Sequence, residues 1–280
     1  MTNAAESVQT KTLLDNRAHS LTHRILTGAG SCAIIAYRAE EQPHLHSVAH
    51  GLASDGTLLV AANVGFHDVD AAFRGDDALE VRVDFMKESP AFDVRIISAT
   101  SHLLGTLEWL TVAEADFAFR DVLLPSHLVD LASQPGGRLG VVHCDRVVTH
   151  TSNGVTAMPF AEIAARHRTC DALFARRVDD VAAELSLAAD DDRLGMYAAA
   201  LAEGWFGGVI LSRRETSEPC APVIGRTFVV DVDQSGLTLM HVGADTTDIV
   251  FAPFDEVARS EPQLRADLEQ LLDLDLHPGA

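Results

Sequence analysis

Basic residues are scarce in this chain of 280 residues. Lys and Arg together number 21 against 41 Asp and Glu, which gives a formal net charge of −20 at pH 7. A field of that sign repels polyanions, so we expect neither nucleic acid nor an anionic membrane surface as a partner. A site for a phosphate or a propionate would have to be built from a few local cations.

Long apolar runs and closely spaced cysteines are also missing. No apolar run approaches the ~20 residues that cross a bilayer, and the polar segment Met1–Thr12 lacks the apolar stretch of a signal peptide. The four cysteines, Cys32, Cys144, Cys170 and Cys220, are too far apart for a metal clip or a redox dithiol. Scattered thiols of this kind are typical of a reducing compartment, so we expect a cytoplasmic protein.

The motifs of several common enzyme classes are absent from the sequence. It has no Gly-x-Gly-x-x-Gly opening a helix and no phosphate-binding loop. It also has no Gly-x-Ser-x-Gly elbow and no His-Glu-x-x-His pair. The sequence therefore lacks the most familiar motifs of nucleotide-binding proteins, hydrolases and metalloproteases.

The segment Cys32–Trp109 reads as a run of short strands. Within it, Leu79–Phe85 alternates strictly between apolar odd positions and charged even positions, which predicts a half-buried strand. Ser54–Thr57 has turn chemistry, and His67–Phe73 looks helical. Three strands, a short helix and further strands in that order favour a small closed barrel over a βαβ nucleotide fold.

A second unit begins near residue 159. Two helical stretches come first, Ala161–Leu187 and Leu194–Glu203. Four strands follow, and a turn joins the second of them to the third. A closing helix carries a leucine stripe at helical spacing. We therefore predict an α+β protein with an N-terminal split β-barrel over residues 1–158 and a smaller α+β domain over 159–280.

Three residues stand out as candidates for binding. His67 follows the third strand at the start of the short helix, where backbone N–H groups favour an anion, although His67 could equally cap that helix. His277 lies in the tail before a proline, where it is either part of a frayed terminus or able to reach a neighbouring subunit. Arg95 lies in the barrel segment, and a guanidinium is the natural partner of a propionate or phosphate.

Several short segments, taken in order, resemble a known family. They are His46–Ala49, Asp55–Val60, His67, Asp93–Arg95, Gly105–Leu107, Asp231–Leu239, Val250–Phe254 and Leu264–Leu272. Their order resembles the haem-utilisation branch of the flavin-binding split-barrel superfamily, which is related to the pyridoxamine-phosphate oxidases. The later segments resemble the small α/β domain that follows the barrel in many such proteins.

This resemblance implies a homodimer with haem or flavin mononucleotide (FMN) in a groove between the subunits. It implies His277 as the iron ligand, with His67 as second choice, and an arginine such as Arg95 on the propionates. Three functions stay open: a haem-binding protein that could degrade haem for iron utilisation, an FMN-dependent oxidoreductase, and a non-catalytic binding or regulatory protein. The third is favoured by Ala188–Arg193, which has acids where the family usually carries a histidine motif.

Overall fold

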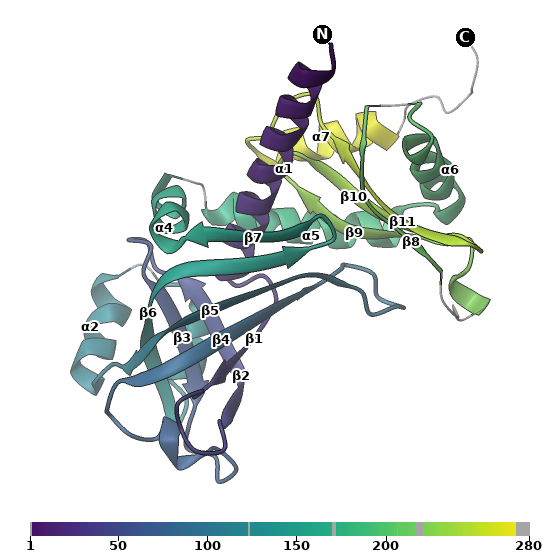
Figure 1. Cartoon of the computed structure of the whole chain (residues 1–280). Helices are drawn as coiled ribbons and strands as arrows, with labels where there is room; N and C mark the ends of the chain where they lie inside the picture. The colour runs from purple at the N-terminus through teal and green to yellow at the C-terminus, as the bar shows by residue number, and fades with distance from the viewer. Residues whose placement is uncertain (1, 123, 170–171, 206, 217–220, 273–280) are drawn as a thin grey trace.

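The computed structural model describes residues 2–122, 124–169, 172–205, 207–216 and 221–272 (Figure 1). Its larger sheet has seven strands. They are β1 (Ser31–Ile35), β2 (His44–Leu52), β3 (Leu58–Asn63), β4 (Leu79–Glu88), β5 (Ile97–Trp109), β6 (Gly137–Thr151) and β7 (Gly154–Pro159). The helices that accompany this sheet are α1 (Thr2–Leu26), α2 (Val112–Asp121), α3 (Ser126–Ala132) and α4 (Phe160–Thr169).

The sheet closes on itself to form a barrel. Its strand order is β3-β2-β1-β4-β5-β6-β7, and an additional pairing between β3 and β6 joins the ends of a six-strand ring. That closing pair is antiparallel and runs from Leu59 opposite Val141 to Asn63 opposite Gly137. Closure leaves no free edge among the six strands. The predicted fold class, a split barrel followed by a smaller α+β domain, is confirmed.

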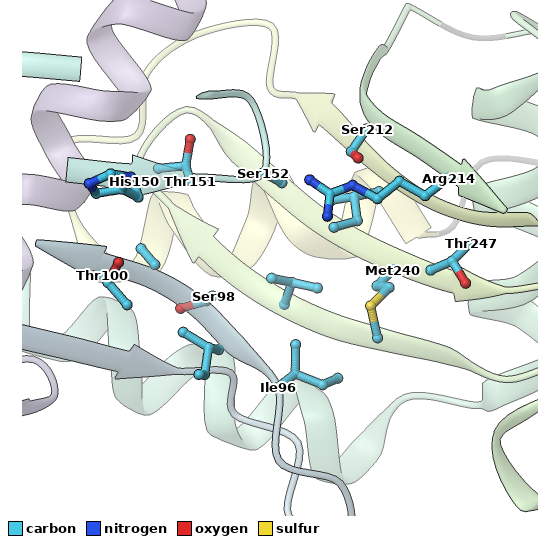
Figure 2. A pocket seen from close by; sticks show the side chains of 14 residues that line it. Ile96, Ser98, Thr100, His150, Thr151, Ser152, Ser212, Arg214, Met240 and Thr247 are labelled. Atoms are coloured by element: carbon cyan, nitrogen blue, oxygen red, sulfur yellow. The ribbon is translucent and has the colours of Figure 1, made fainter. Parts of the chain in front are cut away.

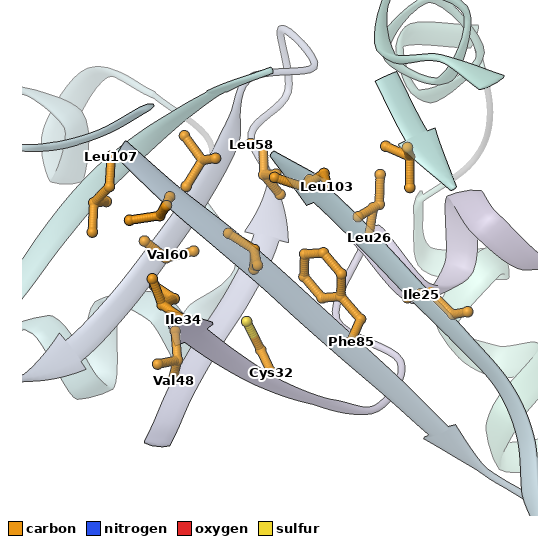
Figure 3. Packing of buried hydrophobic residues seen from close by; sticks show 14 of the residues in the cluster. Ile25, Leu26, Cys32, Ile34, Val48, Leu58, Val60, Phe85, Leu103 and Leu107 are labelled. Carbon is orange, nitrogen blue, oxygen red and sulfur yellow. The ribbon is translucent and has the colours of Figure 1, made fainter. Parts of the chain in front are cut away.

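The barrel core follows from the alternation in the sequence. In β4 the side chains of Val81, Val83 and Phe85 are buried, whereas Glu80 and Arg82 are exposed. Apolar side chains from the other strands meet them inside the barrel (Figure 3). The last turn of α1 closes one end of this core, because Leu21, Ile25 and Leu26 belong to the same cluster.

The second sheet has four antiparallel strands in the order β8-β11-β10-β9. The strands are β8 (Val209–Glu215), β9 (Thr227–Asp233), β10 (Gly236–Val242) and β11 (Thr246–Pro253), with the one-turn η2 (Ala221–Val223) before β9. Helices α5 (Ala172–Ala188), α6 (Asp191–Ala202) and α7 (Glu261–Leu272) share one hydrophobic core with one face of this sheet. The expected leucine stripe is confirmed, since Leu264, Leu268 and Leu271 are all buried. The helix α4 begins directly after β7, and the division into 1–158 and 159–280 stays a prediction.

The segment expected to be a short helix is mostly turns. Only η1 (Ala71–Phe73) is helical, and it is a single 3-10 turn in which the N–H of Ala72 donates to the carboxylate of Asp70. The guanidinium of Arg74 donates hydrogen bonds to three backbone carbonyls of the preceding loop. These contacts hold His67 in an open turn, because the carbonyls that a helix would need are engaged by Arg74.

A buried ionic network joins the two domains. Arg24 on α1 donates to Asp231 on β9, at 3.2 and 2.5 Å, and to Asp179 on α5 at 2.8 Å. Lys87 on β4 lies 2.9 Å from Asp179 and 3.4 Å from Asp231. Burial alone would lower the pKa of Arg24, but the charges of Asp231 and Asp179 outweigh it and raise that pKa. The network therefore fixes the C-terminal sheet against α1 and the barrel.

Candidate functional site

A cavity of about 380 Å³ lies between the barrel and the C-terminal sheet (Figure 2). The start of β5 and the end of β6 form one side of it, and the face of the second sheet opposite its helices forms the other. The cavity is lined by Ile96, Ile97, Ser98, Ala99, Thr100, His150, Thr151, Ser152, Ser212, Arg214, Val230, Met240, Thr247 and Ile249. Both domains therefore contribute to one site.

The sheet side of the cavity is built from a row of paired residues. Ile249 on β11 stands opposite Met240 on β10 and opposite Ser212 on β8. Residues directly opposite one another on neighbouring strands project from the same face of the sheet. Val230 from β9 extends this apolar surface, and Ile97 from β5 contributes to the other side. Six of the lining residues are Ser or Thr, so the cavity combines an aliphatic patch with hydroxyl groups and one thioether.

One arginine at this cavity has no ionic partner among the described residues. Arg213 and Arg214 are neighbours on β8, so their side chains point to opposite faces of the sheet. Arg213 is held by the carboxylate of Asp248 at 2.6 and 3.0 Å. Arg214 lines the cavity, and within the described part of the chain no side-chain hydrogen bond or ion pair engages its guanidinium. Figure 2 shows this side chain lying across the cavity. Arg214 is therefore free to bind an anionic group.

Two histidine side chains lie on the barrel side of the site. His150 on β6 lines the cavity, and its ring stacks on that of His102 on β5 with centroids 5.3 Å apart. Burial, together with the charges of Arg82 and His150, lowers the pKa of His102. His102 lines a second cavity of about 590 Å³ on the outer face of β5 and β6, whereas His150 lines the first. A neutral imidazole is the form that ligates a metal.

The residues expected from the sequence are not gathered at this cavity. Arg95 is exposed, precedes the lining residue Ile96, and donates to the carboxylate of Glu88 at 2.6 Å. His67 lies in an exposed turn and lines neither of these two cavities. His277 lies outside the described residues. The roles of all three stay predictions.

Sequence reasoning missed the residues that do line the cavity. Arg214, Met240 and His150 come from three strands in two domains, and only the pairing of strands brings them together. The one available signal was the Arg213-Arg214 pair on a short strand, because two adjacent arginines must face opposite sides. Asp248 pairs with Arg213, and within the described ranges the guanidinium of Arg214 has no carboxylate partner.

The described residues contain neither a ready metal cluster nor a membrane-spanning helix. No group of three or more His, Cys, Asp or Glu that could hold a metal ion occurs among them. In the same ranges no helix is long and apolar enough to cross a membrane. Cys32 and Cys144 are free thiols, and burial raises the pKa of Cys144 to about 12. Cys170 and Cys220 lie outside the described residues.

Comparison with known proteins finds distant likenesses among solved structures. No family model and no curated protein matches the chain. Among solved structures, a heme binding protein from Mycobacterium smegmatis is 16% identical with a TM-score of 0.43, over 91% of this chain and 96% of that one. The protein Atu2129 of unknown function, from Agrobacterium tumefaciens str. C58, is 15% identical with a TM-score of 0.36, over 92% and 96%. The fold assignment therefore rests on the strand pairing described above.

Proposed function

We propose that this protein binds haem in the cavity between the barrel and the C-terminal sheet. The observation that carries the proposal is that one cavity brings together an aliphatic patch, the imidazole of His150 and the guanidinium of Arg214, which has no ionic partner among the described residues. Haem is a flat apolar ring with two carboxylates and an iron that accepts nitrogen or sulfur ligands. Each of these chemical features has a counterpart among the lining residues.

The residues that line the cavity match the different parts of the haem molecule. Ile97, Val230 and Ile249 offer the apolar surface that covers the ring, and the cavity volume falls within the ~300–1,000 Å³ usual for ligand sites. Arg214 would hold a propionate through a charge-assisted hydrogen bond. His150 would supply the iron ligand, and the imidazole of His277, implied by the family resemblance, is the alternative ligand. Arg95, next to the cavity, would serve as a second partner for a propionate.

Titration with haemin tests this proposal. We expect a saturable Soret band at about one haem per chain. In His150→Ala the position and intensity of the band should change, because the iron loses its imidazole. His277→Ala should leave the spectrum unchanged if His150 is the ligand, and the reverse pattern would assign the iron to His277. The control is His46→Ala, which removes an exposed histidine of β2 that does not line the cavity. Spectra unchanged in both His150→Ala and His277→Ala would contradict ligation by either.

FMN is the second candidate, and the same unpaired cation favours it. A phosphate monoester would suit the guanidinium of Arg214 and the neighbouring hydroxyls of Ser212 and Thr247. Quenching of FMN fluorescence during a parallel titration would support an FMN-dependent oxidoreductase, whereas no saturable change with either cofactor would support a non-catalytic binding or regulatory protein. Loss of the Soret band on adding a reductant in air would add haem degradation to haem binding.

A second copy of this chain is the partner we propose for the outer face of β5, β6 and β7. Leu104 is 56% exposed and Val155 is 64% exposed on this face, beside the stacked pair His102 and His150. Apolar side chains exposed this far are common at protein interfaces. A homodimer formed here would cover the second cavity, which His102 and Leu104 line. Light scattering should report a dimer for the wild type and a monomer for Leu104→Asp, and a monomeric wild type would contradict the proposal.

A further inference from the structure

The hairpin between β4 and β5 extends beyond the barrel toward the C-terminal sheet (Figure 1). Its base is fixed by Lys87, whose ammonium group lies in the buried network with Asp179 and Asp231. At that point the β4–β5 ladder shifts register between Lys87 and Glu88, which marks a bulge. Beyond the bulge the ladder continues with a hydrogen bond from the amide of Ser89 to the carbonyl of Ile96.

An arginine of the other domain holds the tip of the hairpin. Arg226, which follows η2, donates to Asp93 at the tip at 2.6 Å and to Asp191 at the start of α6 at 3.1 Å. Its guanidinium also lies 4.7 Å from the ring centroid of Phe228. Arg226 therefore bridges the hairpin and the C-terminal domain.

The strand that returns from this tip lines the cavity, because Ile96, Ile97 and Ser98 are among the lining residues. We propose that the hairpin over residues 88–97 is a lid on the cavity, hinged at the bulge beside Lys87 and held closed by Arg226. Arg226 is a positioning residue, since it acts on the ligand only through the hairpin. The gating of haem rests on the proposed function, whereas the hinge at the bulge and the latch, which is the pair of contacts that Arg226 makes with Asp93 and Asp191, do not.

The two ends of the hairpin differ in burial, and this difference sets which end opens. At the base the side chains of Lys87 and Asp231 are only 7% and 1% exposed, whereas at the tip those of Arg226 and Asp93 are 31% and 36% exposed. Exposed ion pairs are weak and are screened by salt, while buried ones are screened much less. Loss of Arg226 would also leave Asp93 and Asp191 as two unneutralised carboxylates at one place. The tip of the hairpin is therefore the end that separates from the C-terminal domain.

Hydrogen exchange of the ligand-free protein tests the latch directly. In Arg226→Gln, amides within residues 88–97 should exchange about five- to tenfold faster, which corresponds to the loss of two exposed ion pairs. Arg226→Lys should restore slow exchange in part. The matched control is Arg265→Gln, because Arg265 also bridges two carboxylates, Glu184 and Glu261, but does not contact the hairpin. Equal exchange in Arg226→Gln and Arg265→Gln would overturn the lid.

Stopped-flow mixing with haemin tests the gating. The association and dissociation rate constants should both rise about fivefold in Arg226→Gln, and should rise less on adding salt to this variant than to the wild type. Faster exchange of the hairpin with unchanged haemin rates would confirm the latch and overturn its role as a lid. If exchange accelerates but no variant binds haemin, the haem proposal fails and the latch stands.

Discussion

The guanidinium of Arg24 lies 2.5 Å from the carboxylate of Asp231, and the side chains of both residues are almost fully buried between the two domains. Asp179 and Lys87 complete the network around them. This buried ionic network fixes the distance between the C-terminal sheet and the barrel. It therefore also fixes the shape of the cavity between them.

Arg24→Ala should lower the free energy of unfolding by about 3–5 kcal/mol, because it leaves the buried charge of Asp231 without its main partner. Urea denaturation followed by circular dichroism measures this change. Arg38→Ala serves as the control, since Arg38 pairs with Glu80 at the surface and its loss should cost no more than about 1 kcal/mol. Equal losses in the two variants would show that the buried network does not hold the domains together.

Stability should fall as the pH drops below about 6.5. Burial is the main cause that lowers the pKa of His23 to about 3 and that of His50 to about 4. The unfolded chain takes up protons at these positions near pH 6.5, whereas the folded chain resists them, so protonation favours unfolding. Each histidine should remove up to about 1.4 kcal/mol per pH unit between pH 6.5 and its folded pKa. Urea denaturation at pH 7 and pH 5 measures the slope.

His23→Gln should reduce that pH slope by the contribution of one proton. The ring of His23 contacts His167 at 3.1 Å, and the pKa of His167 is also lowered by burial. His46→Gln is the control, because His46 is exposed on β2. A slope that is the same in all three proteins would contradict the assignment of acid sensitivity to the buried histidines.

Arg214→Gln should weaken haemin binding by about tenfold, because it removes the only cation that lines the cavity among the described residues. Arg213→Gln should leave the affinity unchanged, since Arg213 faces away and is paired with Asp248. The two residues are neighbours of the same type, so the pair of variants separates a local effect from a loss of overall charge. An equal loss of haemin affinity in the two variants would show that Arg214 does not bind the propionate.

The barrel and the helices could be predicted because their signals are local. The alternation of Leu79–Phe85 has the period of a strand, and Leu264, Leu268 and Leu271 have that of a helix, so one buried face follows in each case. The turn around His67 was missed because it depends on the guanidinium of Arg74, whose contacts are specified by no period in the sequence.

The cavity could not be predicted, because it exists only where the strand ends of one domain meet the sheet face of the other. Ile97 and Met240 are far apart in the chain, and both are ordinary core residues by type. Their positions depend on the register of β10 with β11 and on the buried contact of Arg24 with Asp231. Neither of these can be read from composition or periodicity.

Haemin titration of the wild type and of Met240→Trp tests directly whether haem binds in this cavity. The indole would fill the space between the sheet and the barrel, and Met240 is only partly buried, so the variant should fold. We expect a saturable Soret band at about one haem per chain in the wild type and its loss in Met240→Trp, with unchanged circular dichroism. Equal haemin binding by the two folded proteins would contradict the assignment of haem to this cavity.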